Sequence, residues 1–163
     1  MRVYLMRHGP AASQGAWTGE DDHQTLTAEG RDSVDAVAEQ LVLRGVALDR
    51  LVTSPLTRAR ETAEIVAKRL GAADRLEVDS RLQPGFDFED LASILSEHPH
   101  AEALMFVGHQ PDMSAVISRL IGGGSVQCQK GAVARVDLFS VEEPGGSLAW
   151  LLAPASLDAE RKP

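Results

Sequence analysis

Short apolar segments alternate along this chain with longer segments whose apolar residues recur at helical spacing, and no other feature limits the fold as strongly. The segment Ala103 to Val107 is continuously apolar, as expected of a buried central strand. By contrast, Val34, Val37 and Leu41 recur every three or four positions, as on one face of a helix. Strands that alternate with helices build layers, in which helices cover a sheet. The sequence therefore predicts an α/β sandwich.

Turn and cap residues divide the chain into elements. The expected strands are Arg2 to Met6, Leu48 to Thr53, Leu76 to Leu82, Ala103 to Val107, Ala132 to Val141 and Ser147 to Leu152. The expected helices are Ala28 to Arg44 after an N-cap at Thr27, Pro55 to Leu70 after an N-cap at Ser54, Glu89 to Glu97, and Pro111 to Ile121 after a cap at Gln110. We expect all 163 residues to form one domain, with a frayed tail after about residue 154.

The charge and composition exclude several classes of partner. The formal net charge is -8 and no long lysine or arginine run interrupts it, which argues against nucleic acid or an anionic membrane as the partner. No apolar run approaches the ~18 residues of a membrane-spanning helix. The amino terminus also lacks the apolar core of a signal peptide. We therefore expect a cytoplasmic protein.

Disulfide and metal chemistry are not expected. Cys128 is the only cysteine, so no intramolecular disulfide can form. His23, His98 and His100 show no metal-ligand spacing with one another or with Cys128. The sequence therefore predicts neither a metal nor a cofactor.

Polar residues follow three of the expected strands, at the points where helices or loops begin. The three segments are Arg7-His8-Gly9, the stretch from Ser54 to Arg58, and Gly108-His109-Gln110-Pro111. Ligands gather at the carboxyl ends of strands in α/β sheets, because loops from different strands converge there. Helix starts at the same end add free backbone N–H groups that favour anions. Two arginines and two histidines are thus expected on one rim.

These four side chains suit phosphoryl chemistry. An arginine fork binds phosphate oxygens bidentately, so Arg7 and Arg58 are expected to hold the phosphoryl group and to stabilise its charge in the transition state. A neutral imidazole is a competent nucleophile near neutral pH, which makes His8 the candidate nucleophile. His109, if protonated, adds a donor on the opposite side.

Two neighbouring residues are expected to help to bind the phosphate. Gly9 has no side chain, so its backbone is expected to approach the phosphate closely. Ser54 is expected to serve first as an N-cap and second as an auxiliary phosphate contact.

Four stretches of the chain together resemble the histidine phosphatase superfamily (phosphoglycerate mutase-like), in the compact branch of SixA-type phosphohistidine phosphatases. They are Leu5-Met6-Arg7-His8-Gly9, then Leu26-Thr27 with Gly30, then Ser54-Pro55 with Arg58-Ala59 and Thr62-Ala63, and finally Val107-Gly108-His109 with Pro111. The resemblance implies a three-layer α/β/α sandwich around a mostly parallel sheet. It also implies a covalent intermediate on His8, a phosphate pocket made by Arg7, Arg58 and His109, and no metal.

One departure from the family pattern bears on the substrate. Larger members usually place a glutamate acid where this chain has Pro84, and mutase-like members have an asparagine where this chain has Gln14. Proline cannot protonate a leaving group, so a substrate with a good leaving group is favoured. Asp87 or Glu89, just downstream, is the alternative source of an acid.

The sequence therefore predicts a metal-independent phosphatase that hydrolyses phosphohistidine on proteins. Two alternatives remain open: a small-molecule phosphomonoesterase, and a phospho-ligand binding module without turnover. The loop from Pro10 to Gln24 carries Glu20, Asp21 and Asp22, which are expected to repel highly anionic substrates. The oligomeric state is not predicted.

Overall fold

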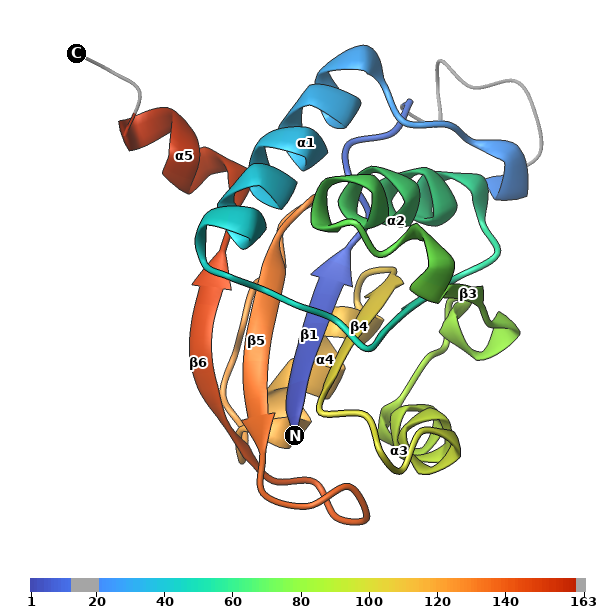
Figure 1. The fold of residues 1–163 in the computed structure, drawn as a ribbon, viewed down its shortest axis with the longest axis vertical. Helices are drawn as coiled ribbons and strands as arrows, with labels where there is room; N and C mark the ends of the chain where they lie inside the picture. Colours follow the sequence, from blue (N-terminus) through green and yellow to red (C-terminus); the bar gives the residue numbers. More distant parts are fainter. Residues whose placement is uncertain (13–20, 161–163) are drawn as a thin grey trace.

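The structure of the protein is a computed structural model that describes residues 1–12 and 21–160 (Figure 1). The expectations for Gln14 and Glu20 lie outside the described residues. Asp21 and Asp22 belong to a short 3-10 helix, η1 (Asp21–His23).

Strands and helices follow one another along the described chain much as the sequence predicts. The strands are β1 (Arg2–Arg7), β2 (Arg50–Thr53), β3 (Leu76–Val78), β4 (Ala103–Gly108), β5 (Val133–Leu138) and β6 (Gly146–Leu152). The α-helices are α1 (Ala28–Leu43), α2 (Thr57–Leu70), α3 (Phe88–Glu97), α4 (Asp112–Leu120) and α5 (Pro154–Glu160). Two more 3-10 helices are η2 (Ala73–Arg75) and η3 (Ser80–Leu82).

The strands form one sheet in the order β3-β2-β4-β1-β5-β6. β1 pairs in parallel with β4, β4 with β2, and β2 with β3. β5 is antiparallel to both of its neighbours, β1 and β6. All strands except β5 therefore point the same way, which confirms the predicted mostly parallel sheet. Figure 1 shows the arrow of β5 opposed to those of β1 and β6.

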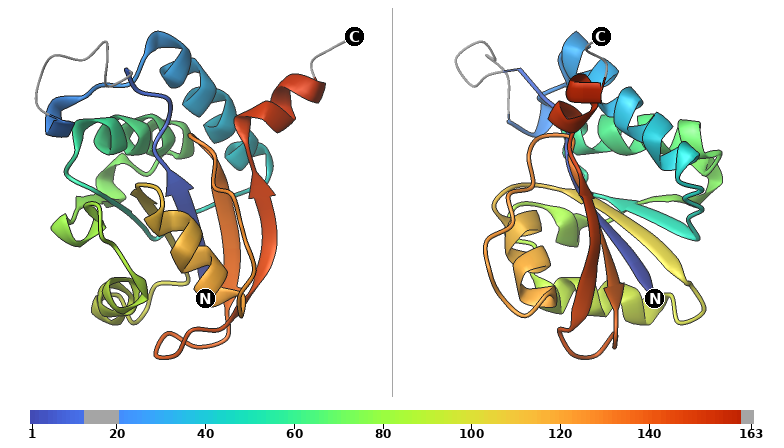
Figure 2. Two further views of the ribbon diagram at one scale, coloured as in Figure 1. Left: turned by 180° about the vertical axis from the view of Figure 1, so that it is seen from behind. Right: turned by 90° about the vertical axis from the view of Figure 1, so that its left-hand side faces the viewer.

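Two layers of helices cover the sheet, and β1 shows how the sequence specifies them. Successive side chains of a strand point to opposite faces. Val3 and Leu5 accordingly join the core beneath α3 and α4, whereas Tyr4 and Met6 join the core beneath α1, α2 and α5. Each large apolar side chain buried in this way stabilises the fold by roughly 1.5–3 kcal/mol. Figure 2 shows the two helical layers on opposite sides of the sheet, which confirms the three-layer sandwich.

Local predictions were wrong at four places. The expected strand from Leu76 to Leu82 ends at Val78 as β3, because Ser80–Leu82 form the 3-10 helix η3. The fourth expected helix begins at Asp112, and its N-cap is Pro111 without a side-chain hydrogen bond, not Gln110.

The other two places are the start of the second helix and the end of the chain. The second helix begins at Thr57 rather than at Pro55, and Ser54 is not its N-cap, because Leu56 holds that position without a side-chain hydrogen bond. The chain after residue 154 is not frayed throughout, since α5 occupies Pro154–Glu160 and Leu157 is buried in the core beneath α1 and α2.

Candidate active site

The three polar segments meet because β1, β2 and β4 are parallel neighbours that end at the same edge of the sheet. Arg7 lies in register with Gly108, and the backbone N–H of His8 donates to the carbonyl of Gly108 (3.0 Å). The backbone N–H of Ser54 donates to the carbonyl of Val107 in the same way (3.0 Å). The hydrogen bonds at the ends of the strands therefore bring the segments that carry His8, Ser54 and His109 side by side.

The ring of His8 is buried, and a hydrogen bond at one of its nitrogens fixes its orientation while the other nitrogen makes none within the described residues. Its Nδ1 lies 2.8 Å from the carbonyl oxygen of Gly9. Because a carbonyl only accepts hydrogen bonds, Nδ1 must carry the proton, and Nε2 is left with its lone pair. Nε2 makes no hydrogen bond within the described part of the chain. The ring of His109 faces that of His8, with the centroids 5.3 Å apart. Nε2 of His8 is thus suited to nucleophilic attack.

The surroundings of His8 hold it neutral. Burial lowers its pKa from 6.5 to about 4, against a smaller opposite effect of the hydrogen bond to Gly9. The positive charges of Arg58, Arg7 and Lys130 lower the pKa further. At neutral pH the imidazole therefore keeps its lone pair, as a nucleophile requires. No pattern in the sequence predicted Lys130, because its position depends on a loop that follows α4.

The two predicted arginines lie beside this histidine. Arg58 is in the first turn of α2 and is only 7% exposed. Nη1 of Arg7 donates to the carbonyl of Cys128 (3.3 Å), while its Nε is buried without a hydrogen-bond partner among the described residues. A buried donor without an acceptor costs about 1–3 kcal/mol. A bound oxyanion would supply that acceptor and so remove the cost.

His109 is held by Ser54. The hydroxyl of Ser54 lies 2.8 Å from Nε2 of His109 and accepts a hydrogen bond from the backbone N–H of Leu56 (3.3 Å). Ser54 is fully buried and His109 is 3% exposed. The structure thus gives the Ser54 hydroxyl two protein partners, and its predicted contact with phosphate remains a prediction.

The close packing of α1 against the loop after β1 requires a glycine at position 9. A Cβ atom at this position would lie 2.5 Å from Cγ2 of Val34 on α1. The backbone N–H of Gly9 donates to Oγ1 of Thr62 (3.0 Å), and that hydroxyl donates in turn to the carbonyl of Arg58 (2.7 Å). Thr62 therefore links the nucleophile's loop to α2. Its stretch was among those that carry the family resemblance, but no role was predicted for it.

The two acidic residues considered as alternative acids have other partners. Asp87 is the N-cap of α3, and its carboxylate accepts from the backbone N–H of Asp90 (3.0 Å). Glu89 forms an ion pair with Arg119 (2.8 Å). The loop that contains Pro84 instead contacts another carboxylate, since Asp112 accepts from the backbone N–H of Gly85 (2.8 Å).

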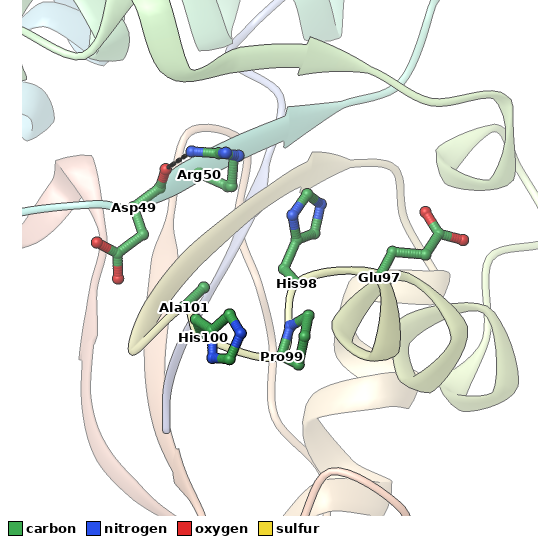
Figure 3. A pocket seen from close by; sticks show the side chains of 7 residues that line it. All are labelled: Asp49, Arg50, Glu97, His98, Pro99, His100 and Ala101. Carbon is green, nitrogen blue, oxygen red and sulfur yellow. Dashed lines mark hydrogen bonds between the residues drawn. The ribbon is translucent and has the colours of Figure 1, made fainter.

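A separate pocket lies at the opposite edge of the sheet, where β2 and β4 begin. It measures about 330 Å³, and Figure 3 shows the seven residues that line it: Asp49, Arg50, Glu97, His98, Pro99, His100 and Ala101. None of them belongs to the predicted phosphate site. Both Arg50 (2.8 Å) and His98 (3.5 Å) are within ion-pair distance of Glu77. In the part of the chain that the structure describes, no group of three or more His, Cys, Asp or Glu residues could hold a metal ion.

A neutral histidine with an open Nε2, next to buried arginine donors, is the arrangement of an enzyme that transfers phosphoryl groups through a phosphorylated histidine. A model of the "Histidine phosphatase superfamily (branch 1)" matches residues 3–91, more than half of the 163 residues. The chain belongs to this superfamily and is a phosphatase.

The chain is also similar to individual proteins over most of its length. An uncharacterised protein of Picosynechococcus is 36% identical over 116 residues, which cover 69% of this chain and 68% of the relative. Phosphohistidine phosphatase SixA of Escherichia coli is 28% identical over 160 residues, 96% of each chain. The solved structure of the protein histidine phosphatase SixA complexed with tungstate has a TM-score of 0.86 and 27% identity, covering 96% of this chain and 99% of the other.

None of the helices described for this chain combines the length and the apolar character needed to cross a membrane.

Proposed function

We propose that this phosphatase removes phosphoryl groups from phosphohistidine on proteins, by way of a phosphohistidine intermediate on its own His8. The absence of a free carboxylic acid at Pro84, where larger members of the superfamily carry one, is the observation that supports this substrate. The nearby carboxylates of Asp87 and Glu89 are a helix cap and an ion-pair partner. The similarity to SixA over 96% of both chains supports the same substrate class.

The first step transfers the phosphoryl group to His8. Nε2 of His8 attacks phosphorus, the bond between phosphorus and the substrate's imidazole nitrogen breaks, and the electron pair of that bond stays on the imidazole. A proton from solvent makes the departing side chain a neutral histidine. Arg7 and Arg58 bind the phosphoryl oxygens and supply the positive charge that the transition state needs, so no metal enters the proposal.

The second step regenerates the enzyme. Water attacks phosphorus on the opposite side from Nε2 of His8, and the phosphorus–nitrogen bond breaks with its electron pair returning to Nε2. Inorganic phosphate leaves with the oxygen of the water, whose protons stay on the phosphate or pass to solvent. His109 faces the ring of His8 and is suited to donate a hydrogen bond to the phosphoryl group in both steps. Ser54 fixes the direction of the His109 ring (2.8 Å).

The chemistry of the leaving group explains why a site without an acid suits phosphohistidine. An alkoxide is the conjugate base of an alcohol about as weak as water, with a pKa of ~15.7, and it leaves slowly unless an acid protonates it. A protonated imidazole leaves as a neutral ring with a reference pKa of about 6.5. Each unit of this difference is worth ~1.36 kcal/mol if fully developed, so a partial share already amounts to several kcal/mol.

Asp112 supports a second candidate function, a small-molecule phosphomonoesterase. Its half-buried carboxylate contacts Gly85, the residue after Pro84, and it lies three residues beyond His109. This carboxylate therefore borders the place where the missing acid would stand. If Asp112 acts as the acid, alkyl phosphates become substrates.

The test compares the two substrate classes directly. Wild type, His8→Ala and Asp112→Asn are assayed in EDTA with a histidine-phosphorylated protein and with an alkyl phosphomonoester. We expect hydrolysis of the phosphohistidine protein only, loss of activity in His8→Ala, and retention in Asp112→Asn. Equal rates on both substrates, with loss of ester hydrolysis in Asp112→Asn, would establish the phosphomonoesterase instead. Binding of phosphate without turnover of either substrate would indicate a binding module.

A further inference from the structure

The segment between α4 and β5 runs along the nucleophile and contacts it through the backbone. The carbonyl of Cys128 accepts from Nη1 of Arg7 (3.3 Å). The backbone N–H of Gly131 lies within hydrogen-bond distance of the carbonyls of both Arg7 (3.2 Å) and His8 (3.0 Å). The backbone N–H of Cys128 is held by the hydroxyl of Ser114 on α4 (3.1 Å). Lys130 is thus attached to the rim of the site by residues on both sides of it.

The charge of Lys130 is available to a ligand. Lys130 is exposed and makes no ion pair within the described part of the chain. It is also the only charged residue between Arg119 and Arg135. Most arginines elsewhere are neutralised by carboxylates; these are Arg2, Arg31, Arg50, Arg60, Arg69, Arg75, Arg81, Arg119 and Arg135. Lys130 therefore carries a positive charge that pairs with no carboxylate of the described residues, on a segment bonded to the backbone of Arg7 and His8.

We propose that Lys130 is a further phosphate-binding residue, which contacts an oxygen of the phosphoryl group at the solvent-facing side of the site. Arg58 is 7% exposed and His109 is 3% exposed, so both contact the group only after it has entered. Lys130 is exposed and can meet the phosphoryl dianion first. This inference rests on the proposed function in one respect: it takes a phosphoryl group bound at His8 as the ligand.

The negative net charge of the chain makes a positive side chain at the entrance of the site necessary. A chain with a net charge of -8 repels a dianion over long distances, and a local cation at the rim must offset that repulsion. Lys130 also acts electrostatically on His8, because its charge lowers the pKa of the imidazole. The same charge stabilises the negative phosphoryl group when it is attached to that ring.

The experiment measures the binding of inorganic phosphate by calorimetry to wild type, Lys130→Gln, Lys130→Arg and Lys68→Gln. Lys68 is a matched control, since it is an exposed lysine in the last turn of α2. We expect the Kd of Lys130→Gln to rise about three- to tenfold at low salt, as for the loss of one partly solvated charge contact. We expect Lys130→Arg and Lys68→Gln to bind phosphate as wild type does. The difference between Lys130→Gln and wild type should shrink at high salt, because salt screens exposed charges.

Unchanged phosphate affinity in Lys130→Gln would overturn the proposal. So would an equal loss in Lys68→Gln, which would indicate a general effect of net charge. Because phosphate binding needs no turnover, its dependence on Lys130 can be observed even if wild type hydrolyses no phosphohistidine, in which case only the proposed function fails. A loss of kcat/KM with a phosphoprotein but not with phosphoramidate would show that Lys130 contacts the protein around the phosphohistidine, and would also contradict the proposal.

Discussion

Replacing Thr62 with valine removes the hydroxyl that ties the loop of the nucleophile to α2, while the side chain keeps its shape. The Thr62 hydroxyl accepts from the backbone N–H of Gly9 (3.0 Å) and is fully buried. In Thr62→Val this N–H is left without an acceptor, which costs roughly 1–3 kcal/mol. If the whole cost falls on the alignment of His8, kcat/KM falls about 5- to 150-fold, since ~1.4 kcal/mol corresponds to a factor of ten.

Thr62→Ser is the matched control, because it restores the hydroxyl and loses only a methyl group. Both variants should lose some stability in urea unfolding, roughly 0.5–1.5 kcal/mol for the missing methyl in serine. Single-turnover phosphorylation of His8 should be slow in Thr62→Val and close to wild type in Thr62→Ser. If His8 is phosphorylated at the same rate in the two variants, the Thr62 hydroxyl does not position the nucleophile.

Three further predictions concern the histidines and their supports. The pKa of His8 in the folded protein is about 4, below its ordinary 6.5, so protonation opposes folding. Stability should therefore fall by up to roughly 3 kcal/mol as the pH drops from 6.5 through 4. His8→Gln should lose less over the same range in urea titrations, and an identical pH dependence would contradict this. Gly9→Ala should cost about 1–3 kcal/mol by overpacking against Val34, and Val34→Ala should recover part of that loss in the double variant. Ser54→Ala should lower kcat more than it raises KM by freeing the ring of His109, and an unchanged kcat would exclude that role.

The sequence was a good guide wherever one local pattern decided the outcome. The continuous apolar run at Ala103 predicted β4, and the helical spacing of Val34, Val37 and Leu41 predicted α1. The predicted rim at the ends of β1, β2 and β4 also follows from local signals, because parallel strands end at the same edge.

Predictions that depended on distant contacts failed or could not be made. Ser54 looked like a helix cap, but its backbone continues the hydrogen bonds of β2 to β4, and its hydroxyl is taken by His109 and Leu56. The helix therefore begins two residues after Pro55. No role was predicted for Lys130, because only the pairing of β5 with β1 brings its loop to His8.

The reversed direction of β5 has a consequence for how the enzyme becomes competent. Because β5 runs against its neighbours, it begins at the edge of the sheet that carries His8, and the carbonyl of Ala132 accepts from the backbone N–H of Arg7 (3.0 Å). β1 thus gains one of its two neighbours only after more than 120 further residues have been synthesised. Such long-range pairing is slow, because the intervening chain must close before the contact forms. Catalytic activity would therefore report that β5 has joined the sheet. A nascent chain that ends before β5 would carry His8, Arg58 and His109 without the segment that contacts the backbone of Arg7 and His8.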